Sequence, residues 1–144
     1  MDRSLKGKVA LVTGAGPGIG RSTALAFARD GADVVLAARR SAPLEKLAQE
    51  IAEESGRRVF AVPTDITDLD ACAEVVARTV AEFGRIDVLV NVATASFPRS
   101  KIMDIDWSTY ADSVQLNVIG TMKVCGEAAR AMAEFPRLIA PDIE

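Results

Sequence analysis

The sequence predicts an α/β fold with a doubly wound, Rossmann-like parallel sheet, and three observations support this prediction. Short apolar runs alternate with segments of helical period along most of the chain. The first run leads directly into a glycine-rich turn at 14–20. Polar or glycine residues follow each run, where the carboxyl ends of the strands are expected. Successive units of this kind form a parallel sheet, because each right-handed crossover lays its helix on a sheet face.

The first half of the chain contains two of these units. Residues 9–12 form a continuous apolar run, as expected for a strand buried on both faces. A helix is predicted over 18–30, closed by Gly31, and a second buried strand over 32–38. Five apolar residues then fall at i, i+3, i+4, i+7 and i+8 on one helical face: Leu44, Leu47, Ala48, Ile51 and Ala52.

The second half continues the alternation. A third strand is predicted over 58–63, and a helix begins near the capping pair Thr67 and Asp68. That helix shows one inward face and ends at Gly84: Cys72, Val75, Val76, Thr79, Val80 and Phe83. A fourth strand is expected over 86–90. Residues 96–106 are mostly loop, and a long helix runs from Ser108 to about Phe135, broken near Gly120. The expected strand order is 3-2-1-4.

Composition excludes several classes of partner. The 144 residues are 49% apolar and 26% charged, which predicts one ordinary globular domain over 1–144. A net charge of −3 gives no general attraction to nucleic acid or to anionic membranes. No apolar run approaches the roughly 18 residues of a membrane span. The chain has no histidine and two isolated cysteines, so we expect no metal site and a reducing, cytoplasmic location.

The glycine-rich turn is predicted to bind a nucleotide pyrophosphate. Gly14 permits a tight exit from the strand, Gly18 lets the backbone approach a phosphate, and Gly20 lets the helix pack closely against the strand. Free N–H groups and the dipole at the helix start attract an anion. A glycine-rich turn alone is a weak signal, but this one lies directly between a buried strand and an amphipathic helix.

The end of the second strand bears on which nucleotide is bound. NAD-binding sheets usually place an acidic residue there to accept hydrogen bonds from the adenosine ribose. This chain instead has Arg39 and Arg40, whose guanidinium groups suit bidentate phosphate recognition. We therefore expect a 2′-phosphate clamp and NADP, with Arg39 the better candidate because it is nearer the strand end. The alternatives are NAD as cofactor, and a plain exposed basic turn that pairs with Glu45.

Four motifs in order resemble those of the short-chain dehydrogenase/reductase family, and the match runs from Lys8 to about Arg130. The segment TGAGPGIG at 13–20 looks like the family's TGxxxGxG. Asp65, with Ile66 beside it, matches the acidic residue that contacts adenine. Residues 91–94 (NVAT) resemble the NNAG motif, with valine and threonine in place of its second asparagine and its glycine.

The fourth motif is LNVIGT at 116–121, whose asparagine, Asn117, matches a member of the family's catalytic tetrad. The resemblance thus implies a catalytic role for Asn117 and a dinucleotide site made of eleven residues: Gly14, Gly16, Pro17, Gly18, Ile19, Gly20, Arg39, Asp65, Ile66, Asn91 and Ala93. Residues 137–140 stand at about the right distance from Asn117 for a stub of the family's fifth strand. The chain is therefore interpreted as the N-terminal portion of the family domain.

The rest of the family's chemistry has no match in these 144 residues. The family reaction needs a serine after strand 5 and a Tyr-x-x-x-Lys whose tyrosine is the general acid or base. Tyr110 is the only tyrosine, it precedes Asn117, and Val114 stands four residues after it. The motifs that are present belong to the adenosine and pyrophosphate half of the family's site. We therefore expect this chain by itself to be inactive.

The resemblance implies an oxidoreductase that transfers a hydride between nicotinamide and an alcohol or ketone carbon, with a small-molecule substrate only if the domain is completed. The alternative is a non-catalytic nucleotide-binding or interaction module that pairs with a full-length subunit. An apolar stripe at helical spacing on the long helix, the fourth of the family, predicts a homo-oligomer through that helix: Val114, Val118, Met122 and Cys125.

Overall fold

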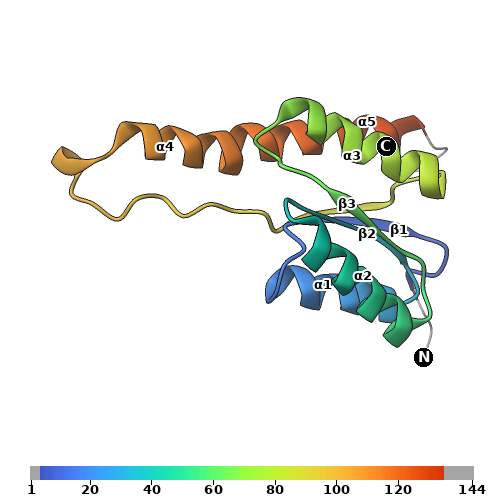
Figure 1. Ribbon diagram of the computed structural model, residues 1–144. Helices are drawn as coiled ribbons and strands as arrows, with labels where there is room; N and C mark the ends of the chain where they lie inside the picture. The colour runs from blue at the N-terminus through green and yellow to red at the C-terminus, as the bar shows by residue number, and fades with distance from the viewer. Residues whose placement is uncertain (1–3, 135–144) are drawn as a thin grey trace.

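The computed structural model describes residues 4–134 and shows a four-stranded parallel sheet with helices on both faces (Figure 1). The strands are β1 (Val9–Thr13), β2 (Asp33–Ala38), β3 (Val59–Pro63) and β4 (Val88–Asn91), in the order β3-β2-β1-β4. The predicted fold class and strand order are confirmed. β4 begins two residues later than the sequence indicated. The predicted strand-5 stub at 137–140 lies outside the described residues.

The two faces of the sheet are covered by different helices. Helices α1 (Ile19–Arg29) and α2 (Ser41–Ser55) cover one face, whereas α3 (Leu69–Phe83) and α5 (Thr121–Glu134) cover the other (Figure 1). Neighbouring strand residues point to opposite faces, so Val12 packs with α1 and α2 while Leu11 packs with α3 and α5. This double burial explains why the strands are continuous apolar runs and not alternating ones.

The start of α3 agrees with the capping signal in the sequence. The Asp68 carboxylate accepts hydrogen bonds from the backbone N–H groups of Asp70, at 2.9 Å, and Ala71, at 3.2 Å. These bonds satisfy two of the free donors at the helix start. Thr67 does not cap the helix and bonds to Asp65 instead.

The predicted long helix is a continuous rod in place of a broken helix. It contains α4 (Trp107–Val114), a π-helical segment η2 (Gln115–Gly120), and α5. Gly120 is the last residue of the π-helical segment. In that segment the hydrogen bonds span five residues in place of four, and the helix continues beyond it. The described part ends at Glu134, and the predicted end at Phe135 lies outside it. The 3₁₀ turn η1 (Ile102–Asp104) interrupts the loop before the rod.

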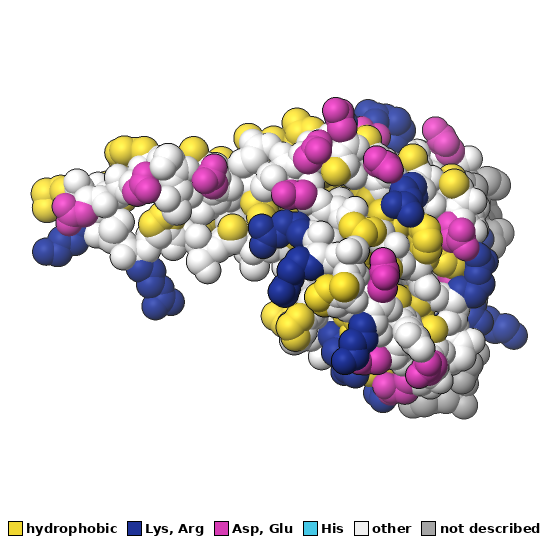
Figure 2. All heavy atoms as spheres, viewed as in Figure 1, with side chains coloured by type: hydrophobic (Ala, Val, Ile, Leu, Met, Phe, Trp, Pro, Cys, Tyr) yellow, Lys and Arg dark blue, Asp and Glu magenta, His cyan; other side chains and the backbone are white. Residues whose placement is uncertain are grey.

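The rod and the loop after β4 extend well beyond the sheet (Figure 1). This protruding part carries exposed hydrophobic side chains, several of which are visible in Figure 2. Ile102 is 78% exposed, Met103 84% and Trp107 65%. Within residues 4–134, no helix is both long enough and apolar enough to cross a membrane.

Candidate functional site

A cavity of about 780 Å³ opens at the carboxyl ends of the strands. It is lined by the turn after β1, the end of β2 with the start of α2, and the loops after β3 and β4. All of the predicted dinucleotide-binding residues except Asn91 line it. The convergence follows from the parallel sheet, because the carboxyl ends of its strands share one edge, and ligands of such sheets bind there.

The glycine turn is packed as tightly as its sequence predicted at two positions. Gly14 has φ +69°, and a Cβ there would lie 2.2 Å from the backbone nitrogen of Ala93. A Cβ on Gly20 would lie 2.3 Å from the carbonyl oxygen of Gly14. A Cβ on Gly16, in contrast, would meet nothing within 4 Å. Gly14 and Gly20 thus let the turn, the helix and the loop after β4 approach one another.

The start of α1 presents backbone donors to the cavity. Gly18 is the N-cap residue, no side chain caps the helix, and its first turn has no acidic residue. Within residues 4–134, the N–H groups of Gly18 and Ile19 make no hydrogen bond. Unpaired N–H groups at a helix start attract an anion. This arrangement fits the phosphate-binding role that the sequence predicted.

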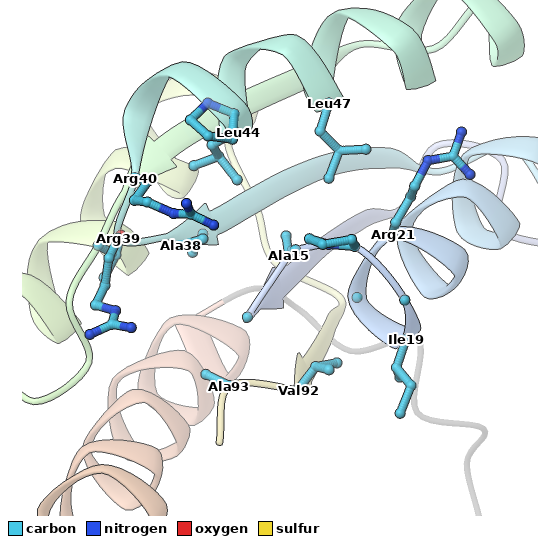
Figure 3. A pocket seen from close by; sticks show the side chains of 18 of the residues that line it. Ala15, Ile19, Arg21, Ala38, Arg39, Arg40, Leu44, Leu47, Val92 and Ala93 are labelled. Atoms are coloured by element: carbon cyan, nitrogen blue, oxygen red, sulfur yellow. The ribbon is translucent and has the colours of Figure 1, made fainter. Parts of the chain in front are cut away.

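The basic end of β2 lies at the opposite wall of the cavity. Arg39 and Arg40 are exposed, and Figure 3 shows their side chains extending in different directions from the strand end. Lys46 from α2 and Arg21 from α1 are the other two cations of the lining. The acidic lining residue nearest to Lys46 in sequence, Glu50, lies 4.0 Å from the Arg21 side chain. The end of β2 itself contributes no carboxylate.

The loop after β3 carries Asp65 and Ile66. The Asp65 carboxylate accepts hydrogen bonds from the backbone N–H of Thr67, at 3.0 Å, and from its hydroxyl, at 2.8 Å. These two bonds lower the pKa of Asp65, and the positive charge of Arg39 lowers that pKa further against the opposing effect of partial burial. Asp65 is therefore an ionised acceptor at neutral pH. Ile66 is buried beneath it.

Asn91, at the end of β4, is not part of the cavity lining. Its side-chain oxygen accepts a hydrogen bond from the Thr13 hydroxyl at 3.1 Å, and its amide nitrogen lies 3.2 Å from the Cys125 sulfur. The side chain therefore ties β4 to β1 and to α5. The three residues that follow it, Val92, Ala93 and Thr94, do line the cavity.

Asn117 also lies outside the cavity lining, in η2. Its side-chain oxygen accepts from the Thr94 hydroxyl at 3.0 Å and from the backbone N–H of Ala95 at 2.9 Å. Its amide group donates to the Ala95 carbonyl at 2.6 Å. These contacts fasten the loop after β4 to the rod. Tyr110 packs its ring against Trp107 and against Phe97.

Some lining residues were not predicted from the sequence. Pro43, Leu44, Lys46 and Leu47 reach the cavity from α2, and Leu116 reaches it from η2. Leu44 and Leu47 were assigned only to the apolar face of their helix. They belong to that face and to the cavity wall together, because α2 begins beside the strand end. Within the described residues, no group of three or more His, Cys, Asp or Glu side chains is placed to hold a metal ion.

Comparison with known proteins places this arrangement in a family. The family model described as short chain dehydrogenase matches residues 8–137. The uncharacterized oxidoreductase YhdF of Bacillus subtilis is 34% identical over 131 residues, which cover 90% of this chain and 45% of that protein. A short chain dehydrogenase/reductase of Aspergillus oryzae, astE, is 36% identical over 117 residues, which cover 81% of this chain and 45% of that protein.

Solved structures agree with the sequence matches. The crystal structure of NAD⁺-bound xylitol dehydrogenase superposes with a TM-score of 0.85 at 32% identity, covering 89% of this chain and 49% of that one. A short-chain type dehydrogenase/reductase of Mycobacterium ulcerans has a TM-score of 0.85 at 35% identity, and the match covers 90% of this chain and 48% of that one. The chain spans about half the length of these relatives. The order of the motifs, the topology and these matches together show that the chain belongs to the short-chain dehydrogenase family.

Proposed function

We propose that this chain binds NADP(H) and forms the adenosine and pyrophosphate half of a short-chain oxidoreductase site. The observation that carries the proposal is the charge at the end of β2. Arg39, Arg40 and Lys46 line the cavity, whereas the strand end has no carboxylate to accept hydrogen bonds from a ribose. A 2′-phosphate carries negative charge, and guanidinium groups bind it bidentately.

The remaining lining residues support a place for each part of the dinucleotide. The free N–H groups of Gly18 and Ile19 would hold the pyrophosphate. Asp65, kept ionised by Thr67, would accept a hydrogen bond from the adenine amino group. Ala93 would lie beside the adenosine ribose. Asn91 and Asn117 would act indirectly, through the strand and loop that they fasten.

The reaction proposed for the completed domain is hydride transfer between the nicotinamide and an alcohol or ketone carbon. The cofactor supplies or accepts the hydride, and a protein acid or base must move the matching proton. This sequence contains no Tyr-x-x-x-Lys. We therefore propose that the 144-residue chain binds its cofactor without turnover. A cytoplasmic location is part of the same proposal, supported by two free thiols.

Calorimetric titration of the 144-residue chain with NADPH and with NADH tests the cofactor assignment. NADPH should bind more tightly, and Arg39→Ala should weaken NADPH binding by about 1.5–3 kcal/mol, the value of a hydrogen bond to a charged group. Binding of NADH should change little. Lys101→Ala, in the loop beyond the cavity, is the matched control for loss of one positive charge.

Two results would contradict the proposal. Equal affinities of the wild-type chain for the two cofactors would exclude the NADP assignment. Sustained oxidation of NADPH with a panel of ketones, abolished by Gly14→Val, would show that some other residue carries the proton. The chain for this assay has to come from a host that cannot supply a full-length partner.

A further inference from the structure

The π-helical segment η2 touches the loop that carries Asp65. The side-chain amide of Gln115 donates a hydrogen bond to the backbone carbonyl of Thr67 at 3.0 Å. Thr67 in turn donates its N–H and its hydroxyl to the Asp65 carboxylate. The first residue of η2 is thus two hydrogen bonds away from a carboxylate in the cavity wall.

The other end of η2 is pressed against the same loop. A Cβ on Gly120 would lie 1.9 Å from the carbonyl oxygen of Ile66, so a larger residue would force the rod and the loop apart. The Cys72 sulfur lies 3.3 Å from that same Ile66 oxygen and 3.8 Å from the Gly120 oxygen. Leu116 packs on the small core of Ile66, Cys72 and Val124 and also lines the cavity.

A second loop, the one after β4, is held by the middle of η2. Asn117 makes three hydrogen bonds with Thr94 and Ala95, just after the lining residue Ala93. One six-residue segment therefore contacts the loops after both β3 and β4. A π-helix forms hydrogen bonds between residues five positions apart, so Gln115 and Gly120 lie on the same side of η2. Neither Gln115 nor Gly120 lines the cavity.

We propose that Gln115 is a positioning residue for the adenosine end of the site, because it holds the loop after β3 in the conformation that presents Asp65. The choice of an adenosine nucleotide as the ligand rests on the proposed function, whereas the contact between Gln115 and the loop does not. Gly120 sets the close approach that brings the Gln115 amide within reach of Thr67. Loss of the Gln115 donor should free the Thr67 backbone and so loosen the Asp65 carboxylate.

The test uses Gln115→Ala and Gln115→Glu in the 144-residue chain. Glutamate keeps the volume of the side chain but has no N–H donor at neutral pH, which separates the hydrogen bond from packing. Asp112→Ala, an exposed change on α4, is the matched control. Amide hydrogen exchange at Thr67 reports the loop directly, and calorimetry with 2′,5′-ADP reports the adenosine end. Circular dichroism checks that each variant is folded.

Both Gln115 variants should speed Thr67 exchange and weaken 2′,5′-ADP binding by roughly two- to tenfold, the value of one neutral hydrogen bond. Asn117→Ala should speed exchange at Ala95 and not at Thr67. Unchanged Thr67 exchange in both variants would overturn the proposal, as would faster exchange with wild-type affinity. If the wild-type chain binds no 2′,5′-ADP, the proposed function fails, and Thr67 exchange still decides whether Gln115 holds the loop.

Discussion

Gly14 and Gly16 belong to the same turn but have different surroundings. Gly14 has a positive φ and lies against the backbone of Ala93, whereas a Cβ on Gly16 would project into open space. Alanine at Gly14 would carry the conformational strain of the left-handed region and also displace the loop after β4. Alanine at Gly16 would carry neither cost.

We therefore predict that Gly14→Ala lowers the free energy of unfolding by at least about 1–3 kcal/mol, the usual cost of such strain. Gly16→Ala should unfold like the wild-type chain in the same denaturant titration. Equal stabilities of the two variants would contradict the packing described for Gly14.

The contacts of single residues were predictable from sequence only where backbone geometry imposes them. Gly14 and Gly20 follow from the spacing of the turn, because no other residue fits those approaches. Asn91 and Asn117 were assigned to the cofactor site and to catalysis by resemblance, and these roles stay predictions. The structure shows that their side chains bond to neighbouring elements. Their orientation depends on helix contacts made far along the chain, which local spacing does not specify.

At the scale of elements, the start of α4 depends on one carboxylate. Asp106 accepts hydrogen bonds from the hydroxyls of Ser108 and Thr109, each at 2.7 Å, and from the Ser108 N–H. The Ser108 hydroxyl, the Thr109 hydroxyl and the Ser108 N–H, in that order, lower the pKa of Asp106 to about 2.

This pKa predicts how the stability of the fold depends on pH. A carboxyl group with a lowered pKa in the folded state stabilises the fold fully above its unfolded pKa, near 3.9. That contribution is lost as the pH falls toward about 2. Asparagine keeps the cap but does not titrate. As the pH is lowered from 5 to 2, the unfolding midpoint of the wild type should therefore fall relative to that of Asp106→Asn. A constant difference would contradict the assignment.

The π-helical segment shows where prediction of elements from sequence fails. Residues 115–120 contain nothing that excludes an ordinary α-helix except Gly120, which indicated a break. The rod continues through it because Gly120 packs against the Ile66 carbonyl, a contact between residues 54 positions apart in the sequence. The bounds of the strands and of α1 and α3 were predictable to within two residues, because their apolar periodicity reflects burial directly.

The rod also carries the predicted association surface, and oligomerisation through it is a proposal. Val118 is 51% exposed and Met122 66%, whereas Val114 and Cys125 are half-buried. We expect the wild-type chain to form dimers or larger species in light scattering, because exposed apolar stripes associate. Met122→Glu should shift the mass toward the monomer. Met103→Glu, the same change in η1 outside the rod, should not. A folded wild-type monomer at high concentration would contradict the proposal.

At the scale of the whole molecule, the cavity is formed from β1 to β4 and their following segments, all within these 144 residues. The relatives are about twice as long. The groups that the family needs for proton transfer have no counterpart in the sequence. We therefore predict that the free energy of cofactor binding comes from the adenosine and phosphate groups, with little from the nicotinamide.

Competitive calorimetry of NADPH and 2′-phospho-ADP-ribose against the 144-residue chain measures the contribution of the nicotinamide. The two ligands share the adenosine, the 2′-phosphate and the pyrophosphate, but only NADPH has a nicotinamide. We predict dissociation constants within about tenfold of each other, a difference of about 1.4 kcal/mol or less in binding free energy. An affinity for NADPH several hundredfold higher would contradict this prediction, because the chain would then also bind the nicotinamide. A failure of both ligands to bind would contradict it too.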